Sequence, residues 1–266
     1  MIISDEHNFC FIHIPKCGGS TIRDQIGDLD SLGGFFHGRT EEIPGGPHQK
    51  AHLPLHAIRD YFPEIFERIS GLEKIVIVRD PEARFLSAMS QRARETHGKF
   101  LDELTEAELR ADFREIADHL KAHPALPSFD FRHFVRQSDF ANLDGKLVVE
   151  HVVPLERISE LVVFLSERTG RYMDSAYHSN QTVVIRNKTL QSSLLWVKEL
   201  VKSVLPITVY GKIKEFGLSL FTDRGVAPHV LKALEKEGFR DFVTTFYADD
   251  YALLELGRSR NTLTGG

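Results

Sequence analysis

A lysine, two glycines and two hydroxyl side chains directly follow an apolar run at 9–14, where the sequence reads Pro-Lys-Cys-Gly-Gly-Ser-Thr. Glycines let the backbone curl so that several N–H groups point inward, and a helix N-terminus adds a partial positive charge. Lysine adds a full positive charge, and the hydroxyls add further donors. The segment therefore predicts an anion-binding loop between a strand and a helix. Its candidate binding residues are Lys16, Gly18, Gly19, Ser20 and Thr21.

The order of these residues differs from that of the common nucleoside-triphosphate loop, G-x-x-x-x-G-K-[ST], in which the lysine follows the glycines. Here Lys16 precedes Gly18. A nucleotide kinase or NTPase would also use an acidic residue near a second strand to hold magnesium, and Asp80 is the obvious candidate. Such an enzyme stays open as an alternative.

A second candidate site follows the buried-strand pattern at 74–78. Arg79 stands at the carboxyl end of that strand, where open α/β sheets bind ligands. Ser87 lies eight residues later, about two turns into a predicted helix. Both side chains are placed to reach one phosphate, the arginine as a two-pronged donor. The alternative is that Arg79 pairs with Asp80 or Glu82 at the sheet edge.

Strands and helices alternate along the chain, which predicts an α/β fold with three layers: a central, mostly parallel sheet flanked by helices, of the P-loop-like type. We expect one domain over residues 1–266, with a helical insertion at 97–127 and a frayed tail at 258–266. Predicted strands lie at 9–14, 74–78 and 146–153. Predicted helices lie at 21–26, 55–69, 82–94, 129–137, 156–168, 190–204, 226–237 and 240–256, and 183–186 is a strand or a loop.

The two candidate segments together resemble a known enzyme family. HIPKCGGSTI at 13–22 is similar to the 5′-phosphosulfate loop of sulfotransferases that use 3′-phosphoadenosine 5′-phosphosulfate (PAPS), and VRDPEARFLSAM at 78–89 is similar to their 3′-phosphate motif. The resemblance is specific over 9–26, 50–56 and 74–90. It points to the carbohydrate group, which includes the heparan and chondroitin enzymes.

The resemblance implies a role for each matching residue. Lys16 would stabilise charge on the leaving phosphate, and the loop residues after it would hold the 5′-phosphate. Cys17 stands where the family usually has threonine, beside the sulfate. Arg79 and Ser87 would hold the 3′-phosphate, and Gln137 is similar to a family position near the cofactor. PAPS would be the sulfuryl donor and 3′-phosphoadenosine 5′-phosphate the product.

Sulfuryl transfer to a hydroxyl needs a base, and histidine has the unperturbed pKa closest to neutral pH. The segment KAHLP at 50–54 resembles the family's G-H-x-P segment, so His52 is the predicted general base and His56 the second candidate. A plain loop histidine is the alternative for His52. His48, His52 and His56 are spaced by four, but Pro47 and Pro54 argue against one metal-binding helix, so no metal site is predicted.

Composition limits the remaining possibilities. Lys and Arg total 33 against 38 Asp and Glu, a net charge of −5 that argues against a duplex DNA partner. No run reaches the roughly 18 apolar residues of a membrane span. The first nine residues do not read as a signal peptide, and two cysteines indicate a reducing compartment. These features predict a soluble cytoplasmic enzyme.

The acceptor is expected to be a hydroxyl of a saccharide or glycolipid, on the resemblance alone. The sequence does not identify that acceptor or set an oligomeric state. A PAPS- or sugar-binding relative without catalysis is a further alternative, since it would keep Lys16 and Arg79.

Overall fold

The computed structural model describes residues 1–38, 40–44, 46–175, 227–260 and 263. Within this part, the central sheet has four strands in the order β1-β2-β5-β8. They are β1 (Ile2–Ser4), β2 (Phe9–Ile12), β5 (Glu73–Val78) and β8 (His151–Pro154). β2, β5 and β8 run parallel, and β1 pairs antiparallel at the edge. The predicted mostly parallel α/β sheet is confirmed, whereas its P-loop-like character stays a prediction.

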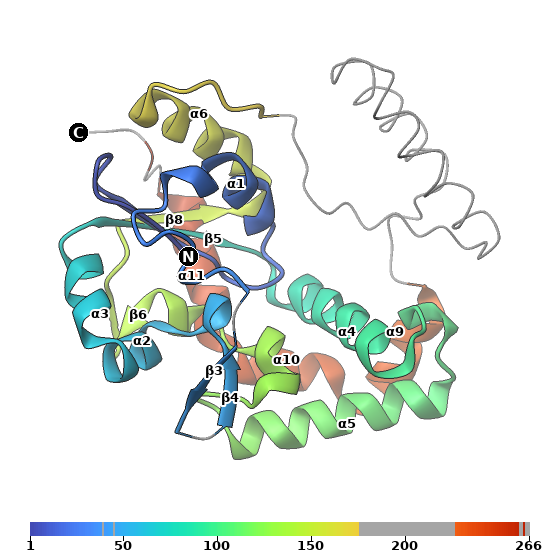
Figure 1. The fold of residues 1–266 in the computed structure, drawn as a ribbon. Coiled ribbons are helices and arrows are strands. Elements are labelled where there is room, and N and C mark those ends of the chain that lie inside the picture. The colour runs from blue at the N-terminus through green and yellow to red at the C-terminus, as the bar shows by residue number, and fades with distance from the viewer. Residues whose placement is uncertain (39, 45, 176–226, 261–262, 264–266) are drawn as a thin grey trace, which may run out of the picture. The chain divides into compact units, whose positions relative to one another are not determined.

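Helices cover both faces of this sheet. Figure 1 shows α1 (Gly19–Ile26) and α6 (Ile158–Thr169) on one side, and α2 (Leu55–Tyr61), α3 (Pro63–Ser70) and α11 (Ala248–Ser259) on the other. The strands are apolar on both of their alternating faces, so both faces have to be covered to exclude water. Every residue of β2 and all but the first of β5 are buried accordingly.

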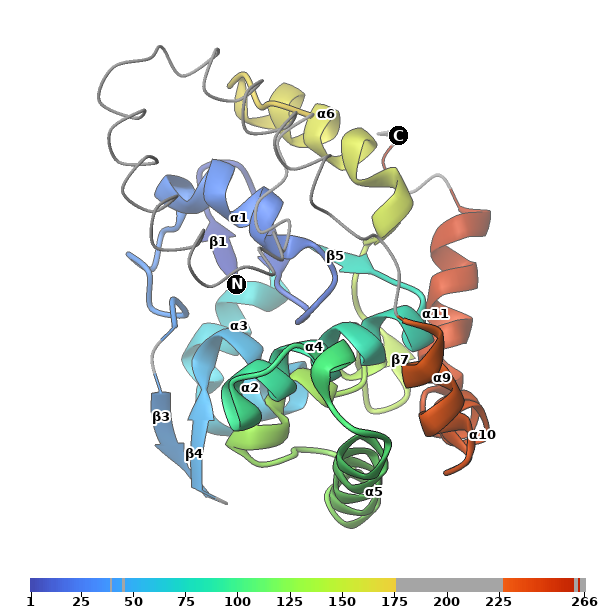
Figure 2. The same cartoon turned by 90° about the vertical axis from the view of Figure 1, so that its right-hand side faces the viewer.

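A further group of described helices packs together, as the ribbon of Figure 2 shows, and several of them contribute rings to a smaller aromatic core. They are α4 (Pro81–His97), α5 (Glu106–Ala122), α9 (Pro228–Glu235) and α10 (Phe239–Phe246). The ring of Phe85 lies 5.0 Å from Phe134, 5.5 Å from Phe239 and 6.0 Å from Tyr247, between ring centres. The stretch predicted as a helical insertion, 97–127, contains α5, which packs against α9.

Two predicted elements are wrong because a turn signal divides them. The helix predicted at 55–69 is two helices, since Pro63 cannot continue α2 and instead starts α3. The strand predicted at 146–153 is divided as well. Asp144 and Gly145 take left-handed conformations and fold β6 (Asn142–Leu143) back on β7 (Lys146–Leu147), so β8 begins only at His151.

Besides β6, two strand regions were not predicted. β1 adds an edge to the sheet, and β3 (Thr40–Ile43) pairs with β4 (Gly46–Gln49) in a region for which no strand was expected. The predicted helix at 240–256 is α10 followed by α11. The helix at 129–137 is a 3₁₀ helix, η4 (Phe129–Phe134).

Internal contacts divide the chain into two units, 1–179 with 227–266, and 180–226. The expected helix at 190–204 and the strand or loop at 183–186 lie outside the described residues. α11 continues to Ser259, into the predicted frayed tail, and the single-domain prediction stays a prediction. Among the described helices, none has the length and apolar character needed to cross a bilayer.

Gly257→Ala should lower the free energy of unfolding by about 1–2 kcal/mol, because α11 packs closely on β8. A Cβ at Gly257 would lie 2.9 Å from the Val152 carbonyl oxygen and 3.2 Å from Pro154 Cδ. Because the Val152 oxygen is a backbone atom that cannot swing away, overpacking should cost about 2–3 kcal/mol, which exceeds the roughly 1 kcal/mol that alanine gains in a helix. Urea unfolding checks this, with exposed Ser259→Ala as the control. A Gly257→Ala protein as stable as the parent would contradict the close packing.

Candidate functional site

The loop between β2 and α1 contains two residues in left-handed backbone conformations. Lys16 has φ 65° and Gly18 has φ 78°, a geometry that turns successive N–H groups toward one side. An added Cβ at Gly18 would lie 2.6 Å from Leu155 Cδ1. The loop thus packs against the segment that follows β8. Ser20 is half-buried and Thr21 buried in the first turn of α1.

The second predicted segment lies beside this loop. Arg79 directly follows β5, and its Nη1 donates to the carbonyl oxygen of Lys16 at 3.2 Å. The acids considered as alternative partners of Arg79 are engaged elsewhere. Asp80 accepts from the Ala83 N–H at 2.8 Å as the N-cap of α4, and Glu82 lies 3.8 Å from an arginine of α10. The two motifs therefore meet at the carboxyl edge of the parallel strands.

Ser87 and Cys17 differ in their accessibility to a ligand. Ser87 lies two turns into α4 and is half-buried. The Cys17 thiol is buried, and burial raises its pKa to about 12. It donates to Oε1 of Gln137 at 3.1 Å, away from solvent. Contact between Cys17 and a ligand would have to use its backbone.

His52 lies in a cluster of three histidine rings. Its ring centre is 5.8 Å from that of His13 and 5.2 Å from that of His133. A Cβ at Gly19 would come 2.7 Å from His13 Cδ2, so the glycine lets this cluster reach the loop. Among the described residues, the buried Nδ1 atoms of His13 and His52 have no hydrogen-bond partner.

Burial keeps these histidines neutral. Burial is the main reason why the pKa values of His13 and His52 lie well below 6.5. Burial also lowers the pKa of His133 to about 3. An uncharged imidazole can accept a proton, so each ring is in the protonation state that a general base requires.

Positive charge surrounds Lys16. Its pKa is lowered to about 8, first by burial and then by the charges of Arg94 and Arg79, with a smaller contribution from Arg132. Glu95 opposes this effect and accepts from Arg132 Nη2 at 3.0 Å. An anion bound beside Lys16 would relieve the repulsion among these cations. The sequence did not identify Arg94, Arg132 and His133 as site residues. Nothing in their spacing along the chain indicates that they lie near the loop containing Lys16.

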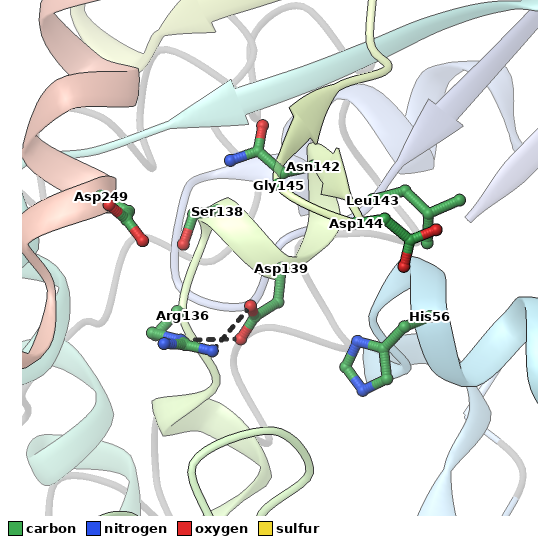
Figure 3. A pocket seen from close by; sticks show the side chains of 9 residues that line it. All are labelled: His56, Arg136, Ser138, Asp139, Asn142, Leu143, Asp144, Gly145 and Asp249. Atoms are coloured by element: carbon green, nitrogen blue, oxygen red, sulfur yellow. Dashed lines mark hydrogen bonds and ion pairs between the residues drawn. The ribbon is translucent and has the colours of Figure 1, made fainter.

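His56 occupies a different place from His52. It lines a cavity of about 240 Å³ together with the ion pair of Arg136 and Asp139, as Figure 3 shows. His48, His52 and His56 belong to β4, the 3₁₀ helix η2 (Lys50–His52) and α2, so they do not share a helix face. No group of three or more potential ligands in the described ranges is arranged to hold a metal ion.

Comparison with known proteins gives one match. The model of a family described as "Sulfotransferase family" matches residues 1–255. No curated protein and no solved structure matches the chain.

Proposed function

Because the chain belongs to the sulfotransferase family, we propose that it transfers a sulfuryl group from PAPS to a hydroxyl of a carbohydrate or glycoconjugate. The observation that carries the donor assignment is the contact between the two anion-binding segments. The Arg79 guanidinium reaches the backbone of Lys16, so donors for two separate phosphates lie at one edge of the sheet. A nucleotide with a phosphate at each end of its ribose suits such a pair of sites.

The residues present fit this donor. The left-handed turn at Lys16 and Gly18 presents backbone N–H groups to an anion, and the first turn of α1 adds donors and a partial positive charge. Arg79 and Ser87 are the candidates for the 3′-phosphate. The lowered pKa of Lys16 supports an anion site, since cations held this close together are stabilised by negative charge.

PAPS supplies a sulfuryl group attached to a phosphate leaving group. Lys16 stabilises the negative charge that develops on that phosphate, as a fixed cation in a partly buried site. His52 removes the proton from the acceptor hydroxyl, since its ring is neutral and stands next to the loop through His13. Arg79 and the loop hold the donor in line with the acceptor, which lowers the entropic part of the barrier.

A thermal-shift titration tests the donor. We expect 3′-phosphoadenosine 5′-phosphate to raise the melting temperature more than ATP with magnesium at equal concentration, because stabilisation follows ligand affinity. A larger shift with ATP and magnesium would favour a kinase or NTPase. Asp80 supports our choice, since its carboxylate caps α4 instead of pointing freely to a metal.

Transfer of radiolabelled sulfate from PAPS to a panel of saccharides and glycolipids tests the reaction. Labelled product would support catalysis and identify the acceptor. Tight binding of the bisphosphate without product on any acceptor would favour a non-catalytic relative.

Arg79→Ala should raise the KM for PAPS by about tenfold or more with a smaller change in kcat, because it removes charge-assisted hydrogen bonds to the 3′-phosphate. Arg79→Lys should give an intermediate KM, since lysine keeps the charge but loses the two-pronged geometry. Initial rates at varied PAPS concentration measure both. Arg59→Ala, which removes a partly exposed arginine paired with Asp60 and Asp144, is the control. An unchanged KM in Arg79→Ala would remove Arg79 from the donor site.

A further inference from the structure

One buried side chain contacts both anion-binding segments. Gln137 has no exposed surface, and its Oε1 accepts from the Arg79 N–H at 2.8 Å and from the Cys17 thiol at 3.1 Å. Its Nε2 donates to the Arg79 carbonyl oxygen at 2.8 Å. The amide therefore pairs with both the N–H and the carbonyl oxygen of Arg79, as a residue of a neighbouring strand would.

This pairing extends the hydrogen bonding of β5 beyond the point where its neighbouring strands end. The ladder of β5 stops at Val76 on the β2 side and at Val78 on the β8 side. Arg79 comes next, and buried backbone groups need partners. Gln137 supplies them, and so fixes the position from which the Arg79 guanidinium extends.

Gln137 is itself held by a buried carboxylate from α11. Asp250 accepts from the backbone N–H groups of Gln137 and Ser138, each at 2.9 Å. Asp250 is fully buried and lies 3.7 Å from the buried guanidinium of Arg84, which donates to the His133 carbonyl oxygen at 3.1 Å. Because Asp250 holds its backbone and its amide makes three hydrogen bonds to Arg79 and Cys17, Gln137 has little freedom to move.

We propose that Gln137 is a positioning residue that sets the spacing between the loop containing Cys17 and the backbone of Arg79. It thereby determines the preference for a nucleotide that carries both a 5′- and a 3′-phosphate. The inference rests on the proposed function. Because its amide hydrogen bonds are directed at Arg79 and Cys17, Gln137 acts through these residues and not by touching the nucleotide.

Calorimetric titration of the full chain with 3′-phosphoadenosine 5′-phosphate and with adenosine 5′-monophosphate tests this role. Gln137→Met keeps the length of the side chain and removes its amide. We expect the Kd for the bisphosphate to rise by about tenfold or more and the Kd for the monophosphate by about threefold or less. A side chain that only stabilised the fold would change both constants equally, and equal changes, or none, would overturn the proposal.

Cys17→Ala provides a second variant in case Gln137→Met does not fold, which circular dichroism would show. It removes the thiol bond to Gln137 and leaves the pairing with Arg79 intact. The bisphosphate should again lose more affinity than the monophosphate, and combining both changes should add little, since they break one connection. Equal losses for the two ligands in Cys17→Ala would also overturn the proposal.

Ser138→Ala is the matched control. Its backbone N–H is held by the same Asp250 carboxylate, but its side chain lines the cavity of Figure 3, so the ratio of the two constants should stay at the parent value. A changed ratio in Ser138→Ala would count against a specific role of the Gln137 amide. If the parent protein does not prefer the bisphosphate over the monophosphate, the proposed donor is refuted. That result differs from a failure of the Gln137 proposal, in which the parent keeps the preference and the variants keep it too.

Discussion

Lys16→Ala should lower kcat by about a hundredfold or more, the range seen when one electrostatic stabiliser of a transition state is removed. Lys16 lies in the loop between β2 and α1 that we propose binds the donor, and its carbonyl oxygen accepts from Arg79. The charge on the leaving phosphate grows during transfer, so the loss should appear in kcat more than in the KM for PAPS. Single-turnover transfer of labelled sulfate measures it.

The lowered pKa of Lys16 predicts that the reaction rate depends on pH in the alkaline range. Its pKa of about 8 means that the free enzyme loses this charge as the pH rises through 8, so kcat/KM for PAPS should fall there. Bound donor is anionic and should raise the pKa of Lys16, which moves the fall in kcat to higher pH. Lys16→Arg keeps its charge and should remove the alkaline fall. A fall that persists near pH 8 in Lys16→Arg would assign it to another group.

His52→Ala should lower kcat by about a hundredfold to ten-thousandfold and leave the KM for PAPS nearly unchanged, as expected when a general base is lost but donor contacts remain. In the parent enzyme, burial holds the pKa of His52 well below 6.5. The imidazole therefore stays neutral as the pH falls from 7.5 toward 6.5. Consequently kcat/KM should remain constant across that range and decline only in more acidic solution.

His56→Ala serves as the comparison, since His56 lines a separate cavity beside Arg136 and Asp139. We expect this variant to keep a kcat within about threefold of the parent, the size of effect typical of a residue outside the reaction. If the large loss occurs in His56→Ala and not in His52→Ala, the base has to be reassigned.

The strands β2 and β5 and the meeting of the two motifs were predictable, because the strands that carry the motifs have local signals. An apolar run ending in a glycine turn marks β2 and its loop, and a second run ending at Arg79 marks β5. Parallel strands bring their carboxyl ends to one edge, so the contact between Arg79 and Lys16 follows from topology.

What could not be predicted depends on contacts between distant residues. The Cys17 thiol and Gln137 are 120 residues apart, and Gln137 and Asp250 are 113 residues apart. Nothing in the spacing of these residues indicates that they meet. The division of the strand at 146–153 is different: Asp144-Gly145 is a recognisable turn signal that the apolar run after it concealed.

The dependence of Gln137 on α11 has a consequence for biosynthesis. The ribosome completes the three parallel strands well before it adds Asp250, which follows Gln137 by 113 residues. At roughly 5–20 residues per second, the delay is on the order of ten seconds. During that interval the carboxylate that accepts from the N–H groups of residues 137 and 138 is not yet part of the chain. Nascent chains should therefore complete the proposed nucleotide-binding edge only when translation of α11 is complete.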